Sequence, residues 1–208
     1  MRCRVLFWDV DTQHDFIDED GKLPAPGAPA IIPNLQKLTR AAVEHGVPIV
    51  ATTDAHPTGD PEFGRFGEHC VPGTRGQRKI AETSPPGAET VAPDTLDDQV
   101  RRLLSGEAPQ LVVEKQVLDA FDQPLADRVV SRIRPGRIIA YGVATEYCVR
   151  AEVLSLLRRG YDVTVVTDAI RAITDEAGEA ALKEMRKAGA RTADTAAVLG
   201  SLSRKAGR

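Results

Sequence analysis

The sequence predicts an α/β fold: a doubly wound, mostly parallel six-stranded sheet with helices on both faces. Short runs rich in β-branched residues alternate with amphipathic helical patterns along the whole chain, which is typical of parallel strands joined by crossover helices. The 208 residues fit one domain, since domains typically have roughly 100–200 residues. No repeat or linker divides the chain, so we expect one domain over residues 1–208.

The elements follow one another in a regular order. We expect strands at residues 5–10, 48–53, 111–114, 137–141, 162–166 and 190–192. Helical patterns between and after them cover residues 33–46, 96–104, 125–133, 145–159 and 174–188, and a last helix starts at 194. Pro33 opens the first of these patterns and Gly46 closes it, in keeping with the helix start and stop signals. The Gly- and Pro-rich stretch at about 54–94 exceeds the usual connection length, which is typical of a functional loop.

Composition excludes several classes of protein. The 27 basic and 30 acidic residues give a net charge of −3, without the clustered basic face of a nucleic-acid binder. Mean hydropathy is −0.23, and no window approaches the roughly 18 apolar residues of a membrane-spanning helix. The chain starts directly in a strand-like run without a signal peptide, and its three cysteines form no CxxC pair. We therefore expect a cytoplasmic protein with reduced thiols and a small-molecule partner.

Reactive side chains follow four of the expected strands. Asp11 lies at the end of the first strand, Asp54 and His56 follow the second, Lys115 ends the third and Cys148 follows the fourth. Because ligands of parallel sheets bind beyond the carboxyl ends of the strands, these residues are expected to converge on one crevice.

Cys148 allows two interpretations. The segment 141–148 reads as a strand, a turn and a helix start with Thr145 as N-cap, so the helix dipole and free N–H groups would favour a nucleophilic thiolate and could hold an oxyanion. Alternatively, Cys148 is a buried small hydrophobe, the usual fate of a free cysteine.

Asp11 and Lys115 are also open to two interpretations. A carboxylate near a thiol could act as general base, and Lys115 could pair with Asp11 and help to ionise the thiol. The alternatives are a turn or cap aspartate and a solvated lysine at the edge of the sheet.

A third group, Asp54, His56, Glu62 and His69, suits one divalent metal ion such as Zn²⁺, Fe²⁺ or Mn²⁺, with positions left open for water or substrate. Cys70 is a less favoured ligand than its neighbour His69, and His14 serves as an ordinary surface histidine for comparison. The alternative is a set of polar residues on a surface loop.

From about residue 5 to 199, the sequence resembles the isochorismatase-like cysteine hydrolases, and among them the nicotinamidases most. The segment 11–16, DTQHDF, matches the opening D-x-Q-x-D-F motif, Lys115 stands at the position of the catalytic lysine, and the segment 142–149, GVATEYCV, matches the nucleophile motif. The resemblance implies Asp11 as base, Cys148 as nucleophile, a cis bond between Val143 and Ala144, and an oxyanion hole formed by the N–H groups of Ala144 and Cys148.

The resemblance also implies a metal ion, with zinc favoured over iron or manganese. Its ligands would be Asp54, His56, His69 and, as a variable fourth, Glu62. The implied reaction is hydrolysis of nicotinamide to nicotinate and ammonia through a thioester, in pyridine nucleotide salvage, with Phe16, Phe66 and Phe121 lining the ring. Alternatives are another amidase of the superfamily, acting on a different amide or carbamoyl compound, and a non-catalytic binding domain. A homo-oligomer is a further expectation, because members of the superfamily are often oligomers.

Overall fold

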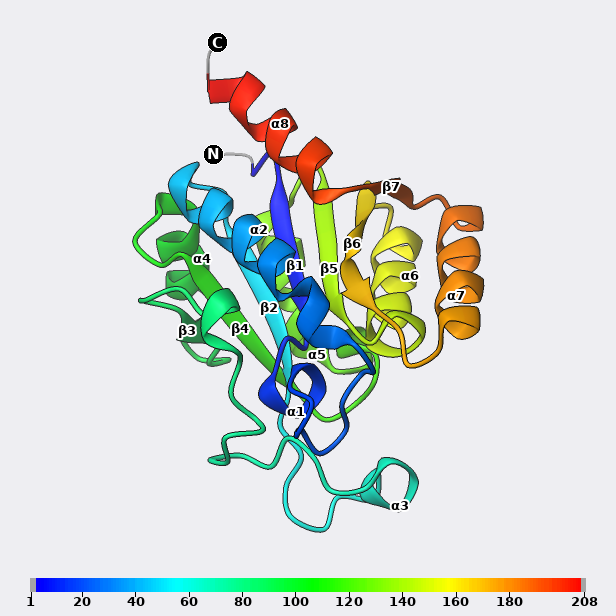
Figure 1. The fold of residues 1–208 in the computed structure, drawn as a ribbon. Coiled ribbons are helices and arrows are strands. Elements are labelled where there is room, and N and C mark those ends of the chain that lie inside the picture. Colours follow the sequence, from blue (N-terminus) through cyan, green and yellow to red (C-terminus); the bar gives the residue numbers. More distant parts are fainter. Residues whose placement is uncertain (1–2, 207–208) are drawn as a thin grey trace.

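The structure, a computed structural model, describes residues 3–206. Seven strands form one sheet at its centre, in the order β3-β4-β2-β1-β5-β6-β7 (Figure 1). Every neighbouring pair is parallel, which confirms the predicted doubly wound α/β fold. The strands are β1 (Leu6–Val10), β2 (Ile49–Asp54), β3 (Glu89–Thr90), β4 (Gln110–Lys115), β5 (Ile138–Val143), β6 (Val163–Arg171) and β7 (Arg191–Ala193).

Helices cover both faces of the sheet. One face packs against α2 (Ile32–Glu44) and α8 (Thr195–Ala206), around a core that includes Phe7 and Tyr141. The other face carries four helices and a larger core that includes Trp8. These helices are α4 (Leu96–Ser105), α5 (Pro124–Ile133), α6 (Arg150–Arg158) and α7 (Asp175–Lys187). Alternate residues of β1 thus point into different cores, as strand geometry requires.

Short helices connect these elements near the edges of the sheet. They are α1 (His14–Ile17), α3 (Phe63–Phe66), the 3₁₀ turns η1 (Ala28–Ile31), η2 (Ala81–Thr83) and η3 (Ala120–Asp122), and the π-helical turn η4 (Thr145–Val149). No helix among residues 3–206 is long and apolar enough to cross a membrane.

Two sequence predictions need correction. The sheet has seven strands and not the predicted six. The sequence did not indicate β3, because this strand pairs with β4 through only two residues, too few to give a periodic signal. The helix predicted over 145–159 is divided into η4 and α6, and Ala144 takes the cap position predicted for Thr145. Val149 donates its N–H to the carbonyl of Ala144, five residues back, and apolar periodicity cannot reveal one extra residue in a turn.

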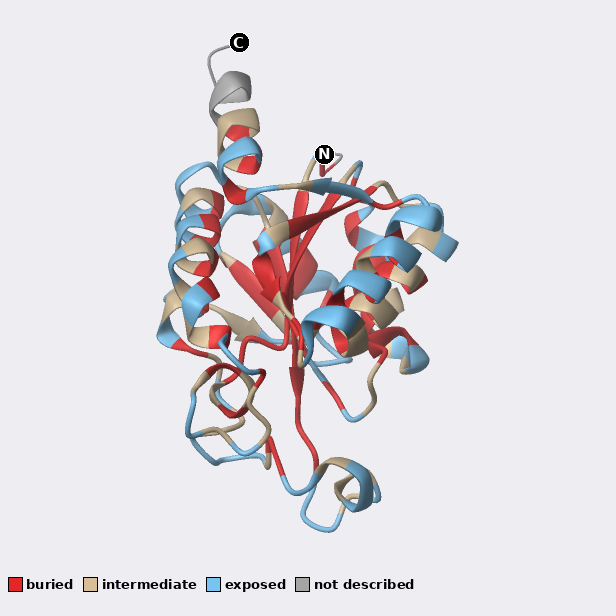
Figure 2. Ribbon diagram, turned by 45° about the vertical axis from the view of Figure 1, so that its right-hand side comes forward, coloured by how far each residue is buried: buried red, intermediate tan, exposed pale blue. Residues whose placement is uncertain are grey.

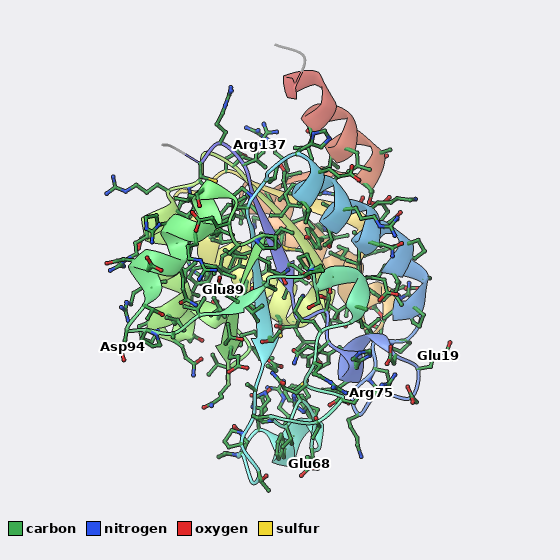
Figure 3. All side chains as sticks on the ribbon, turned by 90° about the vertical axis from the view of Figure 1, so that its left-hand side faces the viewer. Glu19, Glu68, Arg75, Glu89, Asp94 and Arg137 are labelled. Atoms are coloured by element: carbon green, nitrogen blue, oxygen red, sulfur yellow. The ribbon has the colours of Figure 1, made fainter. Side chains whose placement is uncertain are left out.

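The stretch 54–94 is a structured excursion beyond the carboxyl edge of the sheet. It contains α3, η2 and β3, and the part around α3 projects away from the body of the molecule (Figures 1 and 2). Glu68 lies near the end of this projection in Figure 3. The central strands β1, β2 and β5 are wholly buried, whereas α3 has no buried residue. The excursion therefore forms part of the wall around the carboxyl ends of the strands.

Candidate active site

Asp11, Lys115 and Cys148 meet at the carboxyl edge of the sheet. Lys115 Nζ lies 2.8 Å from Asp11 Oδ2 and 3.6 Å from Cys148 Sγ. A carboxylate oxygen of Asp11 and the sulfur of Cys148 lie within 4.8 Å of each other. Asp11, Lys115 and Cys148 lie at or just beyond the ends of β1, β4 and β5, which the strand order places within four adjacent strands, β4-β2-β1-β5, so the ends of three separate chain segments converge, as the sequence predicts.

Lys115 is a buried cation shared by two carboxylates. Its ammonium group also pairs with Asp54, which lies opposite Lys115 in the register of β2 and β4. Burial would lower the pKa of Lys115, but the charges of Asp11 and Asp54 outweigh burial and hold it well above its ordinary value. Lys115 therefore stays charged. Its two carboxylate partners are what allow a lysine to be fully buried.

Burial also raises the pKa of Asp11; Lys115 opposes that rise and the negative charge of Asp54 adds to it. Asp11 has a left-handed backbone, with φ 48°, which aspartate adopts more readily than most residues. Its Oδ1 accepts a hydrogen bond of 2.9 Å from Thr52 Oγ1. A carboxylate with a raised pKa is a stronger base, and this one lies beside a thiol.

The Cys148 thiol is protonated at rest, contrary to the expectation of a thiolate at a helix N-terminus. Burial raises the pKa of Cys148 well above its ordinary value, and Lys115 lowers it only in part. The carboxylates of Asp11 and Asp54 raise it further. Moreover, Cys148 lies in η4, where Tyr147 has non-helical backbone angles, and not in a regular first turn. Nucleophilic attack by this sulfur therefore requires a base to remove its proton.

Asp54, His56 and His69 form a second buried group, with ligand-type atoms within 4.8 Å of one another. The two Nε2 atoms lie 3.6 and 3.8 Å from Asp54 Oδ2. His56 Nδ1 lies 3.2 Å from Asp60 Oδ2, and His69 Nδ1 lies 2.8 Å from the carbonyl oxygen of Gly67. Partners on Nδ1 leave Nε2 free to bind a metal ion.

These three residues fit a divalent metal ion. His56 Nε2 is a buried nitrogen with no hydrogen-bond partner among the described residues, which is unfavourable unless a ligand occupies the site. Burial would raise the pKa of Asp54, but Lys115 lowers it below its ordinary value, so a charged oxygen is available. Two imidazoles and one carboxylate are ligands that zinc, iron and manganese accept.

Three other residues of the loop and the first motif lie outside this group. Glu62 directly precedes α3 and lines the cavity beside the site, but it does not belong to the three-residue ligand group. His14 pairs instead with Asp18. Cys70 is buried, its N–H donates to Asp15 Oδ2 at 2.7 Å, and burial raises the pKa of its thiol far above the ordinary value.

Two polar side chains of the first motif hold the loop in place. Gln13 forms two hydrogen bonds with the backbone of Asp54, accepting from its N–H at 2.7 Å and donating to its carbonyl at 2.8 Å. Asp15 accepts from the N–H groups of Lys22 and Cys70. Within the DTQHDF motif, Asp11 thus lies beside the thiol, whereas Gln13 and Asp15 hold the backbone of the loop in place.

A cavity of about 230 Å³ opens beside Cys148 and the three metal-type ligands. Its wall is largely apolar and includes Phe16 and Phe66, as predicted. Phe121 does not line it, because its ring stacks on Trp8 in the core at a centroid distance of 5.5 Å. An engineered cavity of about 150 Å³ holds benzene, so the space suits one six-membered ring with a small substituent.

Sequence reasoning missed part of this wall. The additional lining residues include Leu23, Pro24, Leu118, Tyr147 and Ile173. Tyr147 packs edge-to-face on Phe66 at 5.7 Å, and its place directly before Cys148 is the one signal that could have indicated it. The others lie on turns that carry no periodic pattern.

The chain belongs to the isochorismatase family of hydrolases, whose family model, the isochorismatase domain, matches residues 6–197. A nicotinamidase of Escherichia coli is 27% identical over 205 residues, covering 87% of this chain and 90% of the relative. A probable inactive nicotinamidase of Arabidopsis thaliana is 24% identical over 184 residues, with 88% of each chain covered. The crystal structure of a pyrazinamidase of Pyrococcus horikoshii in complex with zinc aligns with a TM-score of 0.75 at 29% identity, covering 92% of this chain and 99% of that one.

Proposed function

We propose that this protein hydrolyses the amide bond of nicotinamide, giving nicotinate and ammonia through a thioester on Cys148. One observation carries the proposal: a buried thiol lies beside the carboxylate of Asp11 and the ammonium of Lys115, at the wall of a ring-sized cavity. Relatives named nicotinamidase and the zinc-bound pyrazinamidase support the choice of a heteroaromatic amide.

The reaction requires one proton carrier and one nucleophile. Asp11 takes the proton of Cys148 as the sulfur attacks the amide carbon, and Lys115 stabilises the negative charges that remain nearby. Asp11 then gives its proton to the departing amine, so that ammonia leaves. In the second half, Asp11 takes a proton from water, which attacks the thioester, and returns that proton to the sulfur as the acid departs.

The oxyanion of each tetrahedral intermediate would be held by the backbone N–H groups of Ala144 and Cys148. The bond between Val143 and Ala144 is cis, as the resemblance implies, and Ala144 lines the cavity together with Cys148. Each well-placed donor contributes roughly 3–4 kcal/mol to stabilising the transition state.

Asp54, His56 and His69 would hold one divalent ion, for which we favour zinc. When bound, such an ion supplies a Lewis acid at the cavity wall that can accept a lone pair of the substrate. Phe16 and Phe66 flank this region and would hold the ring by stacking and edge contacts.

The test is ammonia release from nicotinamide by the purified protein, its chelated form and Cys148→Ala. We expect turnover by the first, loss of turnover with chelator that zinc restores, and no turnover by the variant. Cys3→Ala is the matched control, because Cys3 is buried away from the cavity and its pKa is raised to about 11. Turnover by Cys148→Ala at the unsubstituted rate would refute the mechanism, and hydrolysis of an N-carbamoyl compound alone would refute the substrate.

A further inference from the structure

A fully buried carboxyl group lies behind the site and has no part in the reaction described above. Glu152 is 0% exposed and lies on α6, four residues after Cys148, so both side chains share one face of the chain. Trp8 Nε1 donates to Glu152 Oε2 at 2.7 Å, and Oε1 has no hydrogen-bond partner among the described residues. Since burying a partly satisfied carboxyl group is costly, its presence in an apolar core needs a reason.

Thr52 links this carboxyl group to the base. Its Oγ1 lies 2.9 Å from Asp11 Oδ1 and 3.4 Å from Glu152 Oε2, and all three residues are 0% exposed. A threonine hydroxyl has one proton to donate and can accept as well. Two ionised carboxylates would therefore compete for the single proton of Thr52.

Glu152 avoids this competition by staying neutral. Burial raises the pKa of Glu152 well above its ordinary value, and the charge of Asp11 raises it further, while Lys115 and the bond from Trp8 oppose the rise. A neutral carboxyl group carries a proton of its own, and Thr52 Oγ1, 3.4 Å from Glu152 Oε2, can accept it when the Thr52 proton is donated to Asp11. The hydrogen bonds then run in one direction, from Glu152 to Thr52 and from Thr52 to Asp11, and such chains strengthen each other.

We propose that Glu152 is a positioning residue that acts through the Thr52 hydroxyl to hold Asp11 beside Cys148. Trp8 fixes the carboxyl group from behind, and Phe121 stacks on Trp8. The inference rests on the proposed function in one respect, because that function assigns Asp11 as the base.

The first experiment compares kcat and KM for nicotinamide in four variants. Thr52→Val removes the hydroxyl, and we expect kcat to fall about 10- to 100-fold with KM nearly unchanged, as for a lost hydrogen bond to a charged group. Glu152→Leu should give a smaller fall in kcat. In the double variant, Glu152→Leu should cause no further loss, because its effect passes through Thr52. Because Trp8 and Thr52 both contact Oε2, the amide of Glu152→Gln can accept from Trp8 there but cannot also donate to Thr52, so its kcat should fall about as far as that of Glu152→Leu.

Thr53→Val is the matched control. Thr53 lies on the same strand, is 2% exposed and points to the opposite face, and its hydroxyl has no partner among the described residues. Its kcat should equal that of the unsubstituted protein. Melting temperatures of all variants identify any that fail to fold, and Glu152→Gln keeps the test open if Glu152→Leu is one of them.

A second readout needs no substrate. The rate at which iodoacetamide alkylates Cys148, corrected with Cys148→Ala for the other two thiols, should fall in the same order as kcat. If the unsubstituted protein does not hydrolyse nicotinamide but the alkylation order holds, the proposed substrate fails and the role of Glu152 stands. Unchanged alkylation and kcat in Glu152→Leu, or losses that simply add in the double variant, would overturn the inference.

Discussion

Asp9 lies in β1 and Asp11 directly follows it. Each forms a buried ion pair with a lysine, yet the surroundings of the two pairs differ. Asp9 is 0% exposed and pairs with Lys79 at 2.7 Å. Lys79 also donates to Thr12 Oγ1, which donates to Asp9 in turn. We call this cluster of Asp9, Lys79 and Thr12 closed, because its one cation pairs with its one carboxylate and the Thr12 hydroxyl hydrogen-bonds to both.

The cluster around Asp11 is open by contrast. Its single lysine serves two carboxylates, and a thiol and a cavity lie beside it. The comparison teaches that a buried ion pair does not mark an active site on its own. What marks it is an excess of one charge beside a nucleophile and a space for a ligand.

The largest expected difference is in catalysis. Asp11→Asn should lower kcat about 10²- to 10⁴-fold, the usual contribution of a general base. Among the described residues, the one other carboxylate that pairs with Lys115 is Asp54, which belongs to the proposed metal site and cannot replace the base. Asp9→Asn should leave kcat within the error of measurement. Steady-state ammonia release measures both, and equal losses in the two variants would break the comparison.

The second difference is in stability. Lys79→Ala should lower the free energy of unfolding by about 3–5 kcal/mol, because it leaves the buried charge of Asp9 without a cation. The folded fraction should retain the full kcat. Urea denaturation measures the loss. The double variant Asp9→Leu with Lys79→Met should recover most of the stability, since replacing both partners by apolar residues is often nearly neutral; a double variant as unstable as Lys79→Ala would contradict this account.

Two histidine–aspartate pairs with the same spacing sharpen the comparison further. His56 pairs with Asp60, and His14 pairs with Asp18, each four residues apart. Asp60→Asn should weaken zinc binding about 10- to 100-fold, because Asp60 orients a ligand from behind. Asp18→Asn should not affect it. Titration with a competing chelator measures the two affinities, and a similar loss in both would remove His56 from the metal group.

A last expected effect concerns Glu152 and pH. The folded protein keeps Glu152 neutral, whereas the unfolded chain ionises it above its ordinary pKa of 4.5. The unfolded state then binds fewer protons, so stability falls as pH rises above about 4.5, by up to about 1.4 kcal/mol per pH unit. Glu152→Gln has no such dependence on pH, while the titratable groups near Glu152, among them Asp11, Lys115, Asp119 and Cys148, are the same in both proteins.

The stability gained by Glu152→Gln should therefore increase from pH 4.5 to pH 7. Denaturation curves at several pH values measure the difference between the two proteins. A difference that stays constant over this range would show that Glu152 is ionised in the folded state.

Much of the site could be predicted because parallel strands end at one edge. Asp11, Asp54 and Lys115 each follow a run of β-branched residues, so their convergence follows from the fold class. The closed cluster of Asp9 gave no such signal, because Asp9 lies inside a strand and its partner lies in an irregular loop. Glu152 was missed for a related reason: the apolar periodicity of α6 predicts its face but not a carboxyl group within the core.

Contacts between distant segments explain the remaining differences. Phe121 was expected near the substrate, but it packs on Trp8 in the core, and only the position of η3 decides between these two places. The π-helical turn at Cys148 has hydrogen bonds that reach back five residues, from Val149 to Ala144 and from Arg150 to Thr145. Neither feature has a period or a composition that a linear pattern can show.

The part of the excursion that carries Phe66, between Asp54 and Cys70, is tied at both of its ends to one short segment of the first motif. Gln13 holds the backbone of Asp54 where the excursion leaves the sheet, and Asp15 holds the N–H of Cys70 where it returns. Substitutions between these two ends can reshape the cavity wall at Glu62 and Phe66 without moving either end, provided that Asp60 and the carbonyl of Gly67 still support the two histidines. A different amide can thus be accommodated by changes within residues 57–68 while the nucleophile and the base stay in place.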